Sequence, residues 1–235
     1  MESMIKTNHL CKMYGKKYAL KDVTIECQKG LIIGFLGPNG CGKTTLLKIL
    51  TGLIRDYGGV IELAGNHGVN ATTKALVSYL PDEPYFEDSM RIKDVLLMFQ
   101  DMYQDFDIER AQAMIERFQM RKDMYLKTMS KGMKEKFQLS LVMSRNAPII
   151  LLDEPIGGVD PAAREVILDM ILANYREDQT MVIATHLIAD IERIFDSVIF
   201  LQEGQVVLQE DIEDLRMRTG KSVDTFFKEK FKYET

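Results

Sequence analysis

The residues with the clearest chemistry form one glycine-rich loop in the first quarter of the chain. They are Gly37, Pro38, Asn39, Gly40, Cys41, Gly42, Lys43, Thr44 and Thr45. The run fits the pattern G-x-x-x-x-G-K-[ST], in which backbone N–H groups surround the phosphates of a nucleotide. Glycines let the backbone approach the phosphates closely, at the positive end of the following helix. We therefore predict that this loop binds nucleotide phosphates.

Three side chains of this loop would contact the nucleotide or its metal ion. Lys43 would reach the β- and γ-phosphates, and the Thr44 hydroxyl would bind Mg²⁺. Thr45 is placed to donate a hydrogen bond to an α-phosphate oxygen. Cys41 has two interpretations: a small residue that fills space or, if it is exposed and ionisable, a thiol whose modification would block nucleotide binding.

A second group of candidate residues follows the apolar run from Ile149 to Leu152, where Asp153 and Glu154 are adjacent. Carboxylates at the carboxyl end of a strand in an open α/β sheet face the ligand crevice. Asp153 would hold Mg²⁺ through water, as the acid of a Walker-B motif does. Glu154 would be the general base, or would orient the water, for attack on the γ-phosphate.

The elements around the phosphate-binding loop can hold it in place. The apolar run 31–36 precedes the loop, and residues 46–50 have the apolar spacing of a helix. Strand, glycine loop and helix in this order are the context that the motif requires. Residues 1–30 alternate turn signals with short apolar runs, which predicts a small antiparallel sheet. We expect residues 60–63 and 76–80 to continue that sheet.

The rest of the chain alternates helical and strand-like segments. From about residue 89 to 145 the pattern is helical with polar faces, and 134–145 is a helix that leads into the next strand. The later segments are the strands Ile149–Leu152, Met181–Ala184 and Val198–Leu201 and the helix Ala162–Tyr175. Strands that alternate with helices indicate a parallel α/β core. We predict one domain over residues 1–235, with a helical subdomain inserted at about 85–145.

Composition excludes several classes of protein. The 235 residues carry 30 basic and 35 acidic side chains, a net charge of −5, so we expect no nucleic-acid partner. Cys11, Cys27 and Cys41 form no CxxC pair, and their odd number suits a reducing cytosol. The N-terminal residues contain no long apolar segment, so we expect no secretory signal. No run approaches the ~20 apolar residues of a membrane span.

Further motifs connect the two candidate sites. Met129-Ser130-Lys131-Gly132-Met133 precedes a helix, Pro155-Ile156-Gly157-Gly158-Val159-Asp160-Pro161 follows Glu154, and His186 comes one strand later. In order and spacing, from Leu10 to about Phe227, the chain resembles the ATP-binding cassette (ABC) ATPase family. The resemblance implies an α/β fold: a P-loop NTPase core with a mostly parallel sheet, an N-terminal antiparallel β subdomain and an inserted α-helical subdomain.

The resemblance also implies roles for single residues. Tyr14 matches the aromatic residue that stacks on adenine. Ser130 and Gly132 match the signature motif, which contacts the γ-phosphate bound to the opposite subunit of a head-to-tail dimer. Asp160 resembles the acid that crosses the dimer interface, and His186 resembles the switch histidine that holds the γ-phosphate.

Two motifs depart from the family pattern. The usual signature reads Leu-Ser-Gly-Gly-Gln, whereas Lys131 here adds a positive charge that either assists at the phosphate or is solvated. In Tyr79-Leu80-Pro81-Asp82-Glu83-Pro84, Asp82 stands where the family usually has a glutamine that contacts Mg²⁺. We hypothesise that Asp82 still contacts the metal, with Glu83 as the alternative in a shifted register.

Methionine is concentrated in the helical segment. The interpretations are flexible core filler and an adaptable groove for a helix of a membrane subunit. The residues are Met90, Met98, Met102, Met114, Met120, Met124, Met129, Met133 and Met143.

The resemblance implies a motor subunit of a transporter, similar to those of bacterial two-gene exporters. It would use ATP and Mg²⁺, and pair with a second ABC ATPase subunit, identical or related. It would drive a separate polytopic membrane subunit from the cytoplasmic face of the cell membrane. The alternative is a soluble ABC ATPase in iron–sulfur cofactor assembly or another non-transport process.

Overall fold

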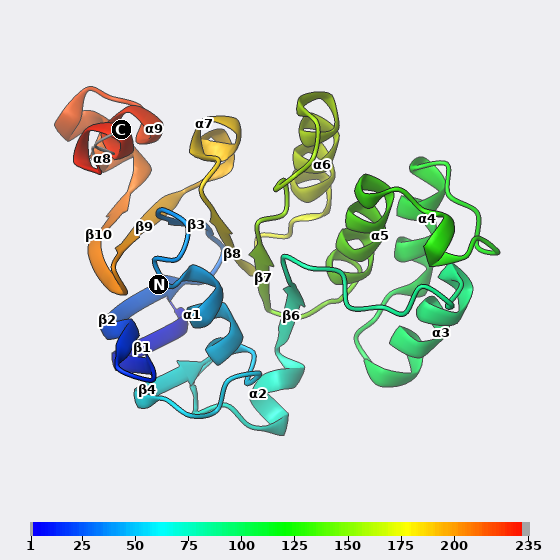
Figure 1. The fold of residues 1–235 in the computed structure, drawn as a ribbon, viewed down its shortest axis with the longest axis horizontal. Coiled ribbons are helices and arrows are strands. Elements are labelled where there is room, and N and C mark those ends of the chain that lie inside the picture. The colour runs from blue at the N-terminus through cyan, green and yellow to red at the C-terminus, as the bar shows by residue number, and fades with distance from the viewer. Residues whose placement is uncertain (1, 232–235) are drawn as a thin grey trace.

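Two β-sheets form the framework of the fold (Figure 1). The computed structural model describes residues 2–231. The smaller sheet is antiparallel, with the strand order β2-β1-β4-β5. Its strands are β1 (Ser3–Tyr14), β2 (Lys17–Gln28), β4 (Gly58–Leu63) and β5 (Asn66–His67). The predicted N-terminal antiparallel sheet is therefore confirmed for residues 3–28 and 58–63.

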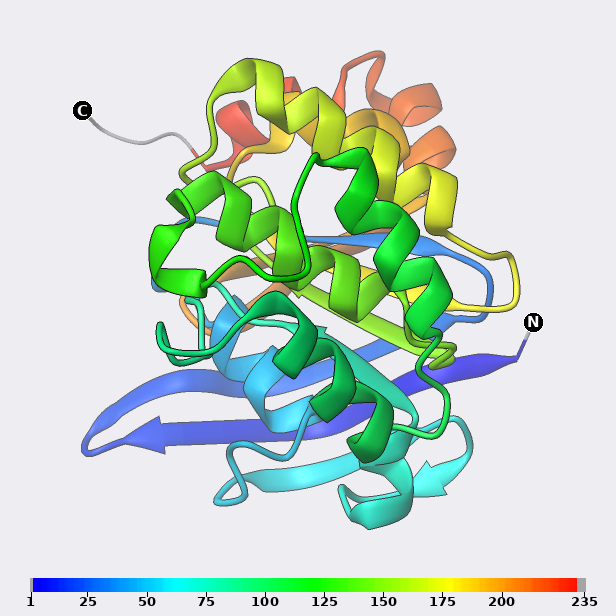
Figure 2. The same cartoon turned by 90° about the vertical axis from the view of Figure 1, so that its right-hand side faces the viewer.

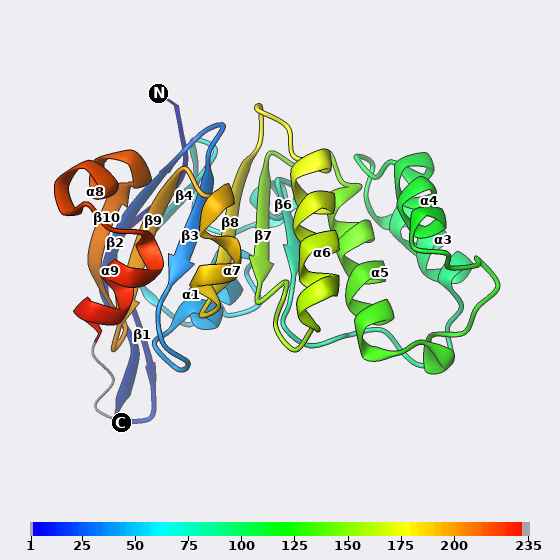
Figure 3. The same ribbon diagram turned by 90° about the horizontal axis from the view of Figure 1, so that it is seen from above.

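The larger sheet has the strand order β10-β9-β3-β8-β7-β6, and Figure 3 shows β3, β8, β7 and β6 side by side. All neighbouring pairs are parallel except β9 and β10. The predicted mostly parallel α/β core is thus confirmed. Its strands are β3 (Ile32–Leu36), β6 (Val77–Leu80), β7 (Ile149–Asp153), β8 (Thr180–Thr185), β9 (Ser197–Gln202) and β10 (Gln205–Asp211).

One strand belongs to a different sheet from the one predicted. Residues 76–80 were expected to extend the antiparallel sheet, but β6 pairs in parallel with β7, with Val77 opposite Ile149. Ser78, the polar residue of this strand, is buried, and its hydroxyl donates to the Val142 carbonyl at 2.9 Å. A short apolar run does not specify its partner strand, so the prediction was wrong.

Helices cover both faces of the larger sheet. Successive strand residues point to opposite faces: Ile33 and Phe35 share one core with α1 and the antiparallel sheet, whereas Ile32 and Leu36 share another with α6. Figure 1 shows α6 and α7 on one side of the sheet and α1 on the other. The bounds are α1 (Lys43–Leu50), α2 (Ala71–Ala75), α6 (Pro161–Asn174), α7 (Ile188–Ile191), η2 (Glu192–Ile194), α8 (Ile212–Thr219) and α9 (Val223–Lys230).

The segment between β6 and β7 forms a group of helices with its own core, which faces the viewer in Figure 2. Its elements are α3 (Ile92–Met102), α4 (Ile108–Arg117), η1 (Leu126–Thr128) and α5 (Lys131–Met143). Helix α5 begins three residues before the predicted start, because Ser130 caps it by accepting from the Met133 amide at 3.3 Å. The division of the chain at about residues 85 and 145 stays a prediction.

The methionines of this segment divide between its core and its surface. Four are buried, as expected of flexible filler, whereas the Met102 side chain is exposed. The buried ones are Met114, Met120, Met129 and Met143. Across residues 2–231, no helix has the length and apolar character needed to cross a membrane.

Candidate functional site

The phosphate-binding loop has the backbone conformation that its glycines allow. Gly40 and Gly42 have φ angles of +78° and +114°, in the region that side-chain-bearing residues rarely adopt. A Cβ on Gly42 would lie 2.5 Å from the Ala19 carbonyl oxygen, because β2 packs directly against the loop. The tight turn between β3 and α1 therefore requires glycine at this position.

Lys43 is held at the centre of the loop. Its side chain is buried, and Nζ donates hydrogen bonds to the carbonyl oxygens of Gly37 at 2.7 Å and Pro38 at 3.2 Å. A buried ammonium surrounded by a glycine loop at a helix N-terminus fits an anionic ligand with several oxygens. The residues present therefore fit the triphosphate of a nucleotide.

Cys41 faces the protein interior. It is 3% exposed, and burial raises the pKa of its thiol above the ordinary value. Both features disfavour the reactive thiolate. The condition for the reactive-thiol interpretation is not met, and the structure agrees with Cys41 as a small residue that fills space.

Thr44 and Asp153 meet at the bottom of the site. The Thr44 hydroxyl donates to Asp153 Oδ1 at 3.1 Å, and Asp153 is buried at the carboxyl end of β7. Burial raises the pKa of this carboxyl to about 6, and the Thr44 hydrogen bond opposes the shift. A hydroxyl beside a buried carboxylate is a donor set that suits Mg²⁺, which binds proteins through few groups and completes its shell with phosphates and water. Residues 2–231 contain no group of three or more His, Cys, Asp or Glu side chains that could hold a metal ion.

Glu154 has an unusual backbone conformation and a closely held carboxylate. Its φ of +48° is left-handed, which is uncommon for a residue with a side chain and typical of functional sites. The Thr185 hydroxyl donates to Oε2 at 2.9 Å, and His186 Nδ1 lies 2.9 Å from Oε1. Lys43 Nζ lies 3.8 Å from Oε1. The turn after β7 thus places the carboxylate between the end of β8 and the loop lysine.

One cavity of about 460 Å³ contains most of the predicted residues. The predicted residues that line it are Asn39, Gly40, Gly42, Lys43, Thr44, Thr45, Asp82, Glu154 and His186. Asp82 lines this cavity and Glu83 does not, which favours Asp82 in the choice between the two registers. Asp153 does not line the cavity, but it accepts a hydrogen bond from Thr44, which does.

Besides Asp153 and the loop residues Gly37, Pro38 and Cys41, four predicted residues do not line this cavity. Tyr14 is 54% exposed near the turn of the β1–β2 hairpin. Ser130 and Gly132 lie at the N-terminus of α5, and a Cβ on Gly132 would meet open space. The Asp160 carboxylate accepts from the Ala163 amide at 3.0 Å and caps α6.

The structure brings three further residues to the site, and one of them, Lys131, was expected either to assist at the phosphate or to be solvated. Thr185 holds Glu154, and its position directly before His186 at the end of a strand was the available signal. Lys131 lines the cavity, and its Nζ lies 2.5 Å from the place of a Cβ on Gly158. Tyr79 approaches Asp153, with its hydroxyl 3.4 Å from Oδ2.

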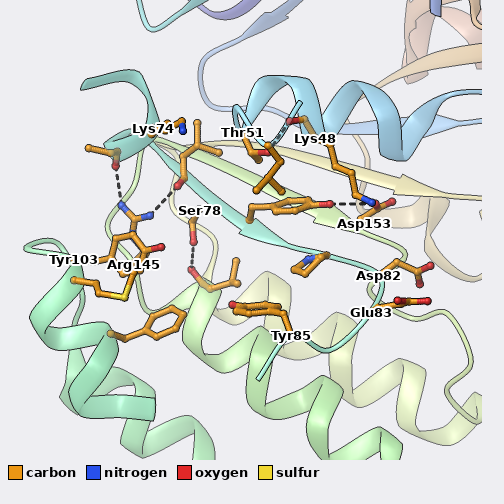
Figure 4. A pocket seen from close by; sticks show the side chains of 18 of the residues that line it. Lys48, Thr51, Lys74, Ser78, Asp82, Glu83, Tyr85, Tyr103, Arg145 and Asp153 are labelled. Carbon is orange, nitrogen blue, oxygen red and sulfur yellow. Dashed lines mark hydrogen bonds between the residues drawn. The ribbon is translucent and has the colours of Figure 1, made fainter. Parts of the chain in front are cut away.

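A groove of about 1010 Å³ adjoins the site on the other side of Asp153 (Figure 4). Lys48 and Lys74 lie on the side of α1 and α2, and Tyr103 and Arg145 lie on the side of the helical segment. Thr44, Asp82 and Asp153 line it as well, so the groove reaches the predicted metal site.

Comparisons with known proteins identify the family of the chain. The family described as "ABC transporter" matches residues 20–157. An uncharacterized ABC transporter ATP-binding protein of Methanocaldococcus jannaschii is 32% identical, over 92% of this chain and 80% of that protein. A lantibiotic transport ATP-binding protein of Streptococcus pyogenes is 26% identical, over 89% and 92%. The solved structure of an ATP-binding subunit of an ABC transporter superposes with a TM-score of 0.86 at 25% identity, over 96% of this chain and 98% of the other. The chain belongs to the ABC transporter family and is one of its ATP-hydrolysing, ATP-binding proteins.

Proposed function

We propose that this chain is the motor subunit of an exporter, in which Glu154 activates water for attack on the γ-phosphate of ATP. The observation that carries the proposal is the position of Glu154, held by Thr185 and His186 with Lys43 at 3.8 Å. A base must lie near the reacting atoms and keep a fixed direction. Glu154 satisfies both demands, because its carboxylate lines the same cavity as the phosphate-binding loop.

Thr44, Asp153 and Asp82 are the residues that would hold Mg²⁺. Thr44 and Asp153 are 3.1 Å apart, and Asp82 lines the cavity beside them. When bound, Mg²⁺ would neutralise charge on the β- and γ-phosphates. Three carboxylates in this region, those of Asp82, Asp153 and Glu154, oppose the approach of a triphosphate, so a bound cation should strengthen ATP binding as well as support turnover.

The site requires a second subunit. Ser130 and Gly132 do not line the cavity of their own chain, yet they form an uncovered N-terminus of the 13-residue helix α5. Free N–H groups and the helix dipole favour an anion at this point. We infer that α5 of one subunit meets the γ-phosphate on the loop of another, and that Tyr14 supports the adenine. Asp160 would lie at the same interface.

The groove in Figure 4 is the proposed docking site for a helix of the membrane subunit. Leu53, Tyr85 and Met102 line it with exposed apolar surface, which suits the apolar face of an amphipathic helix. Within residues 2–231, Lys48 and Lys74 form no ion pair, so an acidic residue on that helix would find cationic partners. Recovery of a polytopic membrane protein with this chain in mild detergent would support the assignment; recovery of a soluble cofactor-assembly complex would contradict it.

The substitution Glu154→Gln tests the catalytic assignment. The amide keeps the size of the side chain but cannot accept a proton, so turnover should fall about 10²–10⁴-fold while ATP binding persists. With MgATP the variant should accumulate as a dimer, measured by light scattering after size-exclusion chromatography. Glu203→Gln is the matched control, because Glu203 also has a left-handed φ, +49°, in an exposed turn. Normal hydrolysis by Glu154→Gln would refute the assignment.

A further inference from the structure

Tyr79 connects the groove with the predicted metal site. Its side chain lines the groove, and its hydroxyl lies 3.4 Å from Oδ2 of Asp153. The other oxygen of this carboxylate, Oδ1, accepts from the Thr44 hydroxyl at 3.1 Å. Asp153 therefore has one hydroxyl donor at each oxygen, one from the phosphate-binding loop and one from the groove.

The strand register brings Tyr79 to this position. Tyr79 lies opposite Leu151 in the parallel pair of β6 and β7, and Asp153 is two residues further along the same face of β7. Diagonal neighbours of this kind are within reach of an aromatic side chain. The ring of Tyr79 packs against the apolar core that contains Leu151, and only its hydroxyl extends to the carboxylate.

Two donors on the two carboxylate oxygens of Asp153 fix its χ2 torsion, which rotamer preference leaves free. The χ2 torsion of an aspartate joins an sp³ to an sp² carbon and has a broad energy minimum. With Thr44 alone, the carboxylate of Asp153 can turn about that torsion while keeping one hydrogen bond. Among the side chains of residues 2–231, Thr44 and Tyr79 are the two that donate to Asp153.

We propose that Tyr79 is a positioning residue, which sets the carboxylate plane of Asp153 for Mg²⁺ in the nucleotide complex. This inference rests on the proposed function, in which Asp153 is a metal-binding acid. Tyr79 does not touch the nucleotide, since it lies outside the cavity of the phosphate-binding loop. Its effect passes through the orientation of Asp153. The ring of the same side chain forms part of the groove wall.

The test is the gain in ATP affinity that Mg²⁺ confers, measured by titration calorimetry in the non-hydrolysing Glu154→Gln protein. Titrations with ATP in Mg²⁺ and with ATP in EDTA are compared for proteins with and without Tyr79→Phe. Loss of one hydroxyl hydrogen bond should reduce the gain about 3- to 10-fold, whereas the affinity in EDTA should stay within about 2-fold. The ATPase of Tyr79→Phe in the otherwise native protein should need correspondingly more Mg²⁺ and recover at saturating Mg²⁺.

Tyr175→Phe is the matched control. Tyr175 is also partly buried, and its hydroxyl donates to the Gln179 carbonyl at 3.2 Å, between α6 and β8 and outside the cavity. The same atom is lost, so the gain from Mg²⁺ should be unchanged. A second control combines Tyr79→Phe with Asp153→Asn, where the tyrosine change should have no further effect on that gain.

The outcomes separate the inference from the proposed function. If Tyr79→Phe keeps the full gain from Mg²⁺, or lowers it equally in the Asp153→Asn background, the positioning role is refuted. If Asp153→Asn itself keeps the full gain, the proposed metal site fails. If Glu154→Gln hydrolyses ATP normally, the catalytic assignment fails, whatever the result for Tyr79.

Discussion

Replacement of Arg145 by methionine should be among the most damaging changes outside the nucleotide site. The guanidinium of Arg145 is buried and donates to the carbonyls of Val77 at 2.8 Å and Ala75 at 2.7 Å. It also donates to both carboxylate oxygens of Asp105 at 3.0 Å and lies 4.0 Å from the centre of the Tyr103 ring. One side chain thus ties the start of β6 to the helical segment across the groove.

The expected cost follows from what the substitution leaves behind. Methionine fills much of the volume but supplies no donor, so two carbonyls and a carboxylate lose their partner. Breaking a buried ion pair costs about 3–5 kcal/mol of unfolding free energy. A domain is typically stable by about 5–15 kcal/mol, so Arg145→Met should lower the urea midpoint by a large fraction.

Urea unfolding without nucleotide, followed by circular dichroism, measures this cost. Asp105→Asn should cost less than Arg145→Met, because the guanidinium keeps both carbonyls and an amide oxygen. Arg121→Met is the control, since Arg121 pairs with Asp123 on the exposed surface and its loss should leave the midpoint unchanged. A loss below about 1 kcal/mol for Arg145→Met would refute the reasoning, since that is the value of one ordinary hydrogen bond.

Two further predictions concern the carboxylates of the site. Asp82→Ala should raise the Mg²⁺ concentration needed for half-maximal ATPase activity several-fold, measured by phosphate release; unchanged Mg²⁺ dependence and turnover would contradict a metal contact. Asp153 has a folded-state pKa of about 6, above its ordinary 3.8, so the native protein binds more protons than the unfolded chain between these values. The penalty for burying the charge is therefore absent below about pH 3.8 and complete above about pH 6. Asp153→Asn should stabilise the nucleotide-free protein more at pH 7.5 than at pH 5 in urea unfolding, and an equal effect at both values would count against the shift.

The sequence predicted local elements better than the pairing between them. The phosphate-binding loop and β7 were identified because glycine spacing and a continuous apolar run are visible within a few residues. The sheet of β6 was assigned wrongly, because parallel pairing with β7 joins residues about 70 positions apart and leaves no local mark.

The candidate site shows the same limit. Lys43, Glu154 and His186 could be named from motifs, and the structure places them in one cavity. The hydrogen bond of Tyr79 to Asp153 could not be predicted, since it depends on the register between strands. The bond of Thr185 to Glu154 depends on register as well, although the position of Thr185 directly before His186 marks it as a candidate. The left-handed φ of Glu154 could not be predicted from the sequence either, because glutamate rarely adopts this conformation and the surrounding turn imposes it.

The hydrogen bonds of Lys43 within its own loop have a consequence for the order of events around a catalytic cycle. The Lys43 ammonium donates to the carbonyls of Gly37 and Pro38, so it keeps hydrogen-bond partners when the nucleotide leaves. The departure therefore does not leave a buried charge without partners. Binding is then an exchange of carbonyl oxygens for phosphate oxygens on a lysine that is already ordered, with little side-chain entropy left to lose. The nucleotide-free loop is therefore already ordered, and the protein can return to it between turnovers without unfolding or refolding its site.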